Sequence, residues 1–282
     1  MRVLVAGATG YLGRFLCAEY SRRGHHVTAL VRDPSRAEGV ADLLVRAEVT
    51  QPETLVGVMD GVDLVVSALG ITRQADGLGY WQVDYEANLN LLREAEKAGV
   101  GRFCYVHVLN AEAMMGVPLV DAKAAFVTHL QASEVPETVI APTGYFSDIK
   151  DFFSMARAGR VWLFGDGSHR LNPIHGADLA EAIADATDDG QSWLEVGGPA
   201  VMTQSQIAKA AFAVLGTEPR ITFLPDILRR ISLGVLPILP RRWGGPAQFF
   251  LTALGMDMEA PCYGTHHLQD HFAELTSSNS RR

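Results

Sequence analysis

Glycines recur at a fixed spacing near the N-terminus, in a stretch that could bind a phosphate group. A GxxGxxG pattern follows the apolar run Arg2–Ala6 directly and precedes a helical pattern. A strand, a glycine turn and a helix start bring backbone N–H groups to one point, where they can bind the pyrophosphate of a dinucleotide. We expect these contacts from the turn and the first helical turn: Gly7, Thr9, Gly10, Tyr11, Leu12, Gly13 and Arg14.

The residues after the second apolar run indicate which dinucleotide is bound. Arg32 follows His26–Val31 directly, and Asp33 comes next. A carboxylate at this place bonds the ribose hydroxyls of NAD, whereas guanidinium groups suit the 2′-phosphate of NADP. Arg14 and Arg36 could join Arg32 there. The sequence therefore favours NADP(H), and NAD(H) held by Asp33 is the alternative.

The elements that position this turn alternate between strand and helix patterns. Apolar runs recur at Asp63–Leu69 and Arg102–His107, with a helical pattern at Trp81–Ala98 between them. Thr203 and Gln206 form a capping box before a later helix. Strands alternating with helices are typical of βαβ units. The predicted fold class is α/β, a doubly wound parallel sheet of the Rossmann type with a small C-terminal substrate-side portion.

The distribution of proline, glycine and polar residues predicts the domain organisation. Residues 1–224 are expected to form the dinucleotide-binding domain, with substrate-side insertions from about residue 142. Residues 225–275 are expected to form a small, irregular helical portion on the substrate side. The polar tail, residues 276–282, is expected to fray.

Composition excludes several classes of protein. The 282 residues carry a net charge of −8, which argues against a nucleic-acid binder, and 48% are apolar, which argues against disorder. The 3 cysteines are widely separated and predict no disulfide framework. The apolar start of the chain enters a glycine turn too soon for a secretory signal, so we expect a cytoplasmic protein.

One apolar run lies between arginine pairs. Ile231–Leu239 is bracketed by Arg229 and Arg230 on one side and by Arg241 and Arg242 on the other. Spanning a bilayer takes about 20 apolar residues, so this run is too short. It predicts a helix that packs over the substrate, with contact to a bilayer surface as the alternative.

Several segments resemble the atypical, NmrA-like members of the short-chain dehydrogenase/reductase family. The resemblance covers residues 1 to about 190 and is carried by GATGYLGR, ALVRDPSR, VVSALG, VDYEANLNLLREAEKAGVGRFCYV and APTGYF. It implies a Rossmann fold and a bound NADP(H). It also implies that Leu69 and Gly70 pass beside the adenosine and ribose, and that the nicotinamide end is lined by Pro142, Thr143, Tyr145 and Phe146.

The chain departs from this family in its catalytic residues. Active members commonly use a Tyr four residues before a Lys, yet the residues four before the 4 lysines are Arg93, Leu119, Phe146 and Ser205. The resemblance places Lys123 where the family's lysine stands, to hold the nicotinamide ribose. The alternative is a surface lysine paired with Asp121 or Glu134.

Two further residues are candidates for moving a proton. Tyr145 could donate one beside the nicotinamide, and His107 titrates near neutrality when unperturbed. Their alternatives are a pocket wall and a packed histidine. A metal site at His266, His267 and His271 lacks the accompanying carboxylates, and no metal is predicted.

The function expected from these residues is an NADP(H)-dependent oxidoreductase. Without the Tyr–Lys pair, reduction of an activated C=C or C=N bond fits better than reduction of a plain ketone. The apolar C-terminal portion indicates a hydrophobic small-molecule substrate. The alternative is a non-catalytic NADP(H)-binding sensor or assembly factor with a protein partner, because NmrA-like proteins include such members. The sequence leaves the oligomeric state open.

Overall fold

The chain consists of two compact units, each described separately below. A computed structural model describes residues 1–71, 77–238 and 241–279, and it describes residues 36, 241–243, 278 and 279 by their backbone only. The first unit comprises Met1–Ala141 and Leu179–Leu194, and the second comprises Pro142–Asp178 and Glu195–Arg282. This division differs from the boundary expected near residue 224, since residues 142–178 and 195–224 group with the C-terminal part.

A seven-stranded sheet organises the first unit. Its strand order is β3-β2-β1-β4-β5-β6-β9, and the registered pairs from β3 to β6 are all parallel. The strands are β1 (Arg2–Ala6), β2 (His26–Val31), β3 (Leu43–Arg46), β4 (Leu64–Ser67), β5 (Arg102–Val106), β6 (Glu137–Pro142) and β9 (Trp193–Val196). The predicted Rossmann-type α/β fold is confirmed. Strand order reverses between β1 and β4, and ligands of such sheets bind at that switch point, beyond the carboxyl ends of the strands.

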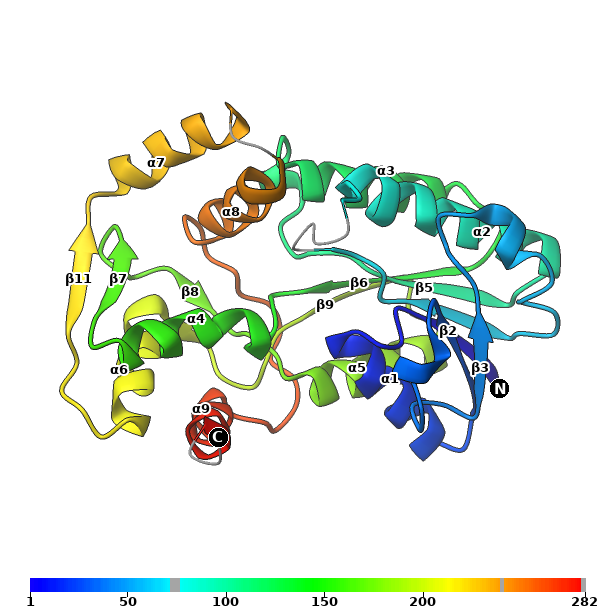
Figure 1. Cartoon of the computed structure of the whole chain (residues 1–282), viewed down its shortest axis with the longest axis horizontal. Coiled ribbons are helices and arrows are strands. Elements are labelled where there is room, and N and C mark those ends of the chain that lie inside the picture. Colours follow the sequence, from blue (N-terminus) through cyan, green and yellow to red (C-terminus); the bar gives the residue numbers. More distant parts are fainter. Residues whose placement is uncertain (72–76, 239–240, 280–282) are drawn as a thin grey trace. The chain divides into compact units, whose positions relative to one another are not determined.

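Helices cover both faces of this sheet. Figure 1 shows α2 and α3 on one face and α1 and α5 on the other. The Tyr20 hydroxyl lies 3.0 Å from the Thr187 hydroxyl and joins α1 to α5. The bounds are α1 (Tyr11–Arg22), α2 (Asn88–Ala98), α3 (Pro118–Gln131) and α5 (Gly176–Asp188), with short 3₁₀ turns η1 (Pro34–Arg36), η2 (Pro52–Leu55) and η4 (Glu112–Met114).

The helix expected over residues 81–98 begins as a π-helix. The segment η3 (Trp81–Ala87) is π-helical and continues into α2, which ends at Gly99 in the left-handed conformation. The buried Asn88 amide donates to the carbonyls of Val83 and Asp84 at 3.1 and 3.0 Å. The Ser67 hydroxyl donates to Asn88 Oδ1 at 2.5 Å. These bonds satisfy backbone carbonyls within the π-helical segment. Short π-helical segments are often found at functional sites.

The second unit is smaller and irregular. Its core is formed by aromatic and aliphatic residues, Phe146, Phe153, Phe212 and Phe272 among them. Its elements are α4 (Phe146–Arg157), β7 (Val161–Phe164), β8 (Arg170–Leu171), β10 (Met202–Thr203), α6 (Gln204–Val214), β11 (Ile221–Leu224), α7 (Asp226–Val235), η5 (Leu236–Ile238), α8 (Arg241–Ala253) and α9 (Leu268–Asn279). Residues 276–279, expected to fray, are the last turn of α9; residues 280–282 lie outside the described part.

Membrane-spanning segments were sought over the described residues. No helix among them is both long enough and apolar enough to cross a bilayer.

The first prediction concerns Gly13 in the first turn of α1. A Cβ there would collide with the Gly7 carbonyl and with Cα of Ala8, which are backbone atoms. Gly13→Ala should therefore lower the free energy of unfolding by about 1–3 kcal/mol, measured by urea denaturation. The matched control is Gly234→Ala in α7, where a Cβ meets nothing within 4 Å and alanine should add about 0.5–1 kcal/mol. Equal changes in the two variants would contradict the prediction.

Candidate functional site

The glycine turn lies between β1 and α1, at the switch point of the sheet. Gly7 adopts a φ of 82°, and a Cβ on it would lie 2.9 Å from the Ala68 carbonyl oxygen at the end of β4. Gly10 N–H donates to the Gly7 carbonyl at 2.9 Å. Among the described residues no side chain caps α1, and its first turn holds no acidic residue. The positive end of the helix dipole is therefore offered to a ligand, and the turn fits a pyrophosphate.

The charged residues after β2 differ in what they do locally. Asp33 Oδ1 accepts hydrogen bonds from the Ser35 N–H at 3.1 Å and the Ser35 hydroxyl at 2.7 Å, so this carboxylate caps η1. Arg14 and Arg32 are exposed. The side chain of Arg36 lies outside the described part. The Asp33 carboxylate therefore has a structural role at the start of η1, and its presence after β2 does not by itself indicate a ligand for the ribose hydroxyls of NAD.

Lys123 is buried in the first unit. Its side chain, on α3, donates to the Val106 carbonyl at 3.0 Å and to the Tyr105 hydroxyl at 3.4 Å. Its Nζ lies 3.3 Å from Asp84 Oδ1, and the residue is only 8% exposed. The expectation of a surface lysine paired with Asp121 or Glu134 is therefore wrong. The ammonium thus makes two hydrogen bonds, while Asp84 Oδ1 is an ion-pair neighbour that has no hydrogen-bond partner among the described residues.

Asp84, the partner of this lysine, escaped the sequence analysis. It comes from η3, is fully buried, and accepts a hydrogen bond from the Ile71 N–H at 3.3 Å. A Cβ on Gly70 would lie 2.8 Å from Asp84 Oδ1 and 3.1 Å from Lys123 Nζ. The backbone at Gly70 thus lies directly against the ion pair. The pair sits just beyond the carboxyl ends of β4 and β5, the edge where such sheets bind their ligands.

Burial determines the charge of this pair. Desolvation raises the pKa of Asp84 to about 6, and the nearby Lys123 ammonium and Ile71 N–H only partly oppose it. At neutral pH the carboxylate is ionised and compensates the ammonium. The arrangement therefore places a buried ion pair, without net charge, at the edge of the sheet.

His107, at the end of β5, is not placed to act as a cationic acid. It is 5% exposed, and burial together with the Lys123 charge lowers its pKa to about 3. Its Nδ1 has no hydrogen-bond partner among the described residues. The ring packs edge-on against Trp193, with centroids 6.1 Å apart. The imidazole is neutral at pH 7, so it cannot serve there as an imidazolium proton donor.

The residues expected at the nicotinamide end belong mainly to the second unit. Pro142 ends β6, and the buried Thr143 hydroxyl donates to the Asn172 carbonyl at 2.6 Å. Tyr145 is half-buried, and its N–H donates to Asp148 Oδ2 at 3.3 Å at the start of α4. Phe146 is fully buried. Leu69, Lys123 and His107 belong to the first unit.

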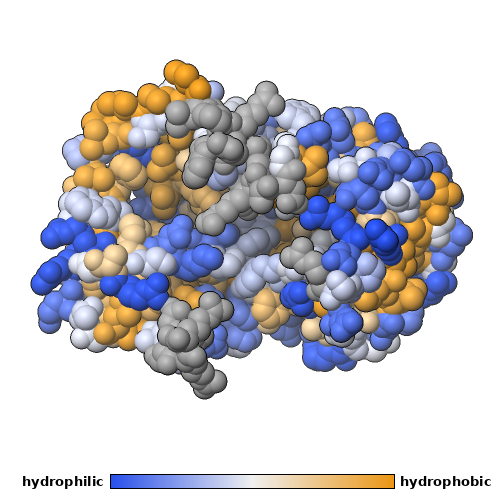
Figure 2. Space-filling model, viewed as in Figure 1, coloured by the Kyte–Doolittle hydropathy of each residue, from blue (hydrophilic) through white to orange (hydrophobic). Residues whose placement is uncertain are grey.

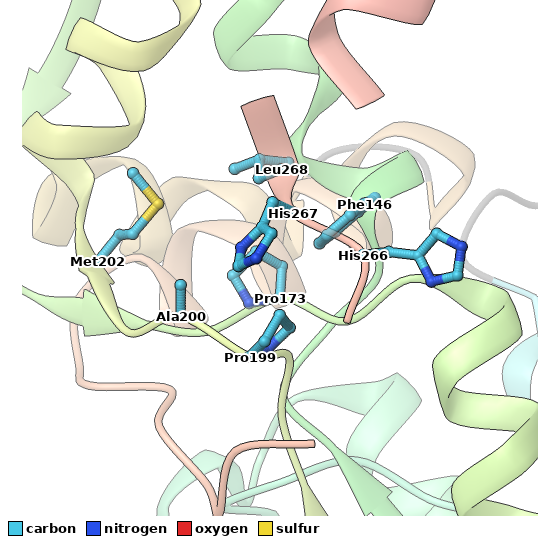
Figure 3. A pocket seen from close by; sticks show the side chains of 8 residues that line it. All are labelled: Phe146, Pro173, Pro199, Ala200, Met202, His266, His267 and Leu268. Atoms are coloured by element: carbon cyan, nitrogen blue, oxygen red, sulfur yellow. The ribbon is translucent and has the colours of Figure 1, made fainter. Parts of the chain in front are cut away.

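A small pocket lies wholly within the second unit. Figure 3 shows the His267 ring directed among the apolar lining residues and the His266 ring turned away. The lining residues are Phe146, Pro173, Pro199, Ala200, Met202, His266, His267 and Leu268.

A carboxylate holds the histidines behind this pocket. The buried Asp178 accepts hydrogen bonds from the N–H groups of Thr265 and His266, at 3.1 and 3.0 Å, and lies 2.6 Å from His266 Nδ1. The His175 ring stacks on His266 with centroids 4.3 Å apart. In the part of the chain that is described, no group of three or more His, Cys, Asp or Glu residues could hold a metal ion.

Comparison with known proteins identifies the family. Residues 7–190, from the first glycine of the turn to beyond α5, match the NAD(P)H-binding family model. The chain belongs to this NAD(P)H-binding family. The expected resemblance to atypical, NmrA-like short-chain dehydrogenases/reductases is confirmed, and so is a dinucleotide cofactor.

The relatives of this NAD(P)H-binding protein fall into two kinds. A chloroplastic divinyl chlorophyllide a 8-vinyl-reductase of Arabidopsis thaliana is 28% identical over 98% of the chain and 76% of its own length. The photosystem II assembly factor Ycf39 of Synechocystis sp. is 28% identical over 82% of the chain and 72% of its own length. The chain spans 66–76% of the plant reductases that it matches.

A solved structure shares the fold over nearly the whole chain. The NADPH-dependent quinone oxidoreductase QOR2 of Escherichia coli has a TM-score of 0.78 at 18% identity, covering 97% of this chain and 99% of its own. At that identity the likeness concerns the fold alone.

The second prediction follows from the raised pKa of Asp84. The folded state holds this proton more tightly than the unfolded state, so the stability it contributes is present below about pH 4 and lost as pH rises through about 6. Relative to Asp84→Asn, the wild type should lose free energy of unfolding between pH 4 and 7, measured by urea denaturation. Asp151→Asn, at an exposed site in α4, controls for the change in charge. A wild-type difference that stays constant with pH would refute this assignment.

Proposed function

We propose that the chain is an NADP(H)-dependent reductase that acts on an activated C=C or C=N bond of a hydrophobic small molecule. The observation that carries this proposal is the buried Lys123–Asp84 pair against Gly70, at the ligand-binding edge of the sheet. A protein that only bound the adenosine half of a dinucleotide would need the glycine turn but not this pair. Burying two charges is costly, so its place at this edge supports a role there.

In this proposal, different residues bind different parts of NADPH. The glycine turn and the start of α1 bind the pyrophosphate, and Arg32 with Arg14 contacts the 2′-phosphate. Asp84 positions Lys123, whose ammonium holds the ribose hydroxyls on the nicotinamide side. When bound, NADPH supplies the hydride.

The proton that completes the reduction needs a separate source. In this proposal Lys123 holds the ribose and is not the proton donor, and His107 is neutral and buried. Tyr145, half-buried before α4, remains the candidate among the residues expected to move a proton, and solvent is the alternative source. An activated C=C or C=N bond tolerates late protonation by either one, which is why this reaction class suits the residues present.

The relatives indicate a substrate class. The Arabidopsis relative is a reductase of the 8-vinyl group of divinyl chlorophyllide a, a large, mostly apolar molecule with a conjugated C=C bond. We therefore propose a conjugated vinyl group on such a molecule as the first bond to test. Divinyl chlorophyllide a would be incubated with the protein and NADPH deuterated at C4 of the nicotinamide. One deuterium in the reduced product supports the proposal; no product and no oxidation of NADPH across a panel of C=C and C=N compounds would overturn it.

The third prediction concerns turnover. Lys123→Met should leave binding of 2′,5′-ADP, the adenosine half of NADP, largely unchanged. It should lower the rate of NADPH oxidation by on the order of 100-fold, because a displaced nicotinamide ring reacts slowly. The exposed Lys150→Met in α4 is the matched control. Tyr145→Phe tests the proton donor: a lower rate with unchanged NADPH affinity supports Tyr145, and an unchanged rate supports solvent.

The fourth prediction concerns the choice of cofactor. Arg32→Glu should weaken NADPH by about 10- to 150-fold, since a charge-assisted hydrogen bond contributes about 1.5–3 kcal/mol. NADH affinity should change little, because NADH lacks the 2′-phosphate. Titration calorimetry measures both, with the exposed Arg157→Glu of α4 as control. Equal weakening of both nucleotides would place the phosphate elsewhere.

A second function is favoured by a specific observation. The chain lacks the YxxxK pair, and His107 is buried and neutral, as suits an NADP(H)-binding sensor or assembly factor. The likeness to Ycf39 of Synechocystis supports this reading. A sensor would bind NADPH without oxidising it for any substrate, and Gly10→Val, which should remove nucleotide binding, would change its affinity for a protein partner.

A further inference from the structure

Helix α7 turns its apolar side outwards. Ile227, Ile231 and Val235, spaced four residues apart, are 57%, 56% and 49% exposed. Leu228 of the same helix is 43% exposed, and Ile238 of η5, which follows the helix directly, is 82% exposed. Residues at this spacing share one helix face. Figure 2 shows this apolar surface as an orange area at the upper left, where α7 lies in Figure 1. We call these five residues the α7 face.

The inward side of α7 includes a buried arginine. Arg229 is only 8% exposed, and its guanidinium bonds Asp226 Oδ1 at 2.6 Å and the Leu251 carbonyl of α8 at 2.9 Å. A Cβ on Gly255 would collide with that guanidinium. The arginine is therefore built into the unit while the aliphatic residues face out. An amphipathic helix normally has the reverse arrangement, so the α7 face is not explained by packing within the chain.

The charge of the surrounding sequence selects one kind of partner. Helix α7 begins with Asp226, which pairs with Arg229 and Arg230. Residues 227–256 then contain 4 arginines and no further acidic residue, in a chain whose net charge is −8. Arg230, beside the α7 face, has a side chain that is 71% exposed. The same stretch contains Trp243, Phe249 and Phe250. An aliphatic helix face within a basic, aromatic-containing segment is typical of helices that lie in the surface of an anionic bilayer.

We propose that the α7 face docks onto the surface of an anionic lipid bilayer. Its aliphatic side chains enter the boundary between headgroups and acyl chains, and the lipid phosphates attract the exposed Arg230, together with Arg241 and Arg242 later in the sequence. The helix lies on the membrane and does not span it. The expectation that Ile231–Leu239 packs over the substrate is replaced for Ile231, Val235 and Ile238, which are exposed; Leu239 lies outside the described part.

Vesicle flotation tests this proposal on the full chain. The vesicles are phosphatidylcholine alone and phosphatidylcholine mixed with phosphatidylglycerol. The wild type should float with the mixed vesicles, less at high salt because screening weakens the attraction, and little with the neutral ones. Ile231→Asp should lower the partition coefficient at least about tenfold. Arg230→Glu should lower binding to the mixed vesicles only.

Controls separate docking from loss of the fold. Val56→Asp places the same charge on another exposed apolar residue, 73% exposed and in the first unit, and should float like the wild type. Urea denaturation of each variant should show unchanged stability. No flotation of the wild type, or flotation unaffected by Ile231→Asp, overturns the proposal. A dimer in sedimentation that Ile231→Asp dissociates also overturns it, since the face then covers a second copy. NADPH affinity is not expected to change in any of these variants, so the outcome is independent of the reductase proposal.

Discussion

The ion pair between Lys123 and Asp84 is the buried contact that joins separate elements of the first unit at the edge of the sheet. Two opposite charges without solvent are tolerated only if each finds good partners, and breaking such a pair by removing one side commonly costs about 3–5 kcal/mol. Here β5 supplies a carbonyl and a hydroxyl to the ammonium, and the backbone at Ile71 supplies an N–H to the carboxylate. Three elements are therefore fixed relative to one another by a single pair of charges.

The π-helical turn follows from the same constraint. Asp84 lies within η3, while Asn88 satisfies the carbonyls of Val83 and Asp84 and is itself held by Ser67. A regular α-helix would present residue 84 at a different angle. The π-helical segment thus departs from regular α-helical geometry and places the Asp84 carboxylate against Lys123. Gly70 completes the arrangement, because any side chain there would press on both charges.

Several elements of both units could be predicted from local sequence pattern. The runs Arg2–Ala6 and His26–Val31 are strands with those bounds, and both hydrogen bonds of the Thr203–Gln206 capping box are present. These features depend on residues close together in the chain. The short strand Leu43–Arg46 and helix α4 were missed, since neither has a strong periodic pattern with clear end signals.

The site was harder to predict because its key contact is not local. Lys123 was singled out through the family resemblance, but its partner lies 39 positions earlier, in a helical pattern judged by apolar periodicity. The π-helical turn alters that periodicity, so a buried aspartate beside Val83 resembled a solvent-facing residue. Two features of the sequence could have indicated the pair: Asp84 stands beside the apolar residues of its helical pattern, and the chain has only 4 lysines that could pair with it. The burial that lowers the pKa of His107 likewise depends on tertiary packing.

The central claim is that the Lys123–Asp84 pair lies beside the nicotinamide half of a bound NADP(H). A crystal structure of the full chain with NADP⁺ tests it most directly. The account predicts Lys123 Nζ within hydrogen-bond distance of a hydroxyl of the nicotinamide ribose, Asp84 still in contact with the ammonium, and the pyrophosphate at the N-terminus of α1. A nucleotide bound with its nicotinamide ribose out of reach of Lys123 would contradict the account.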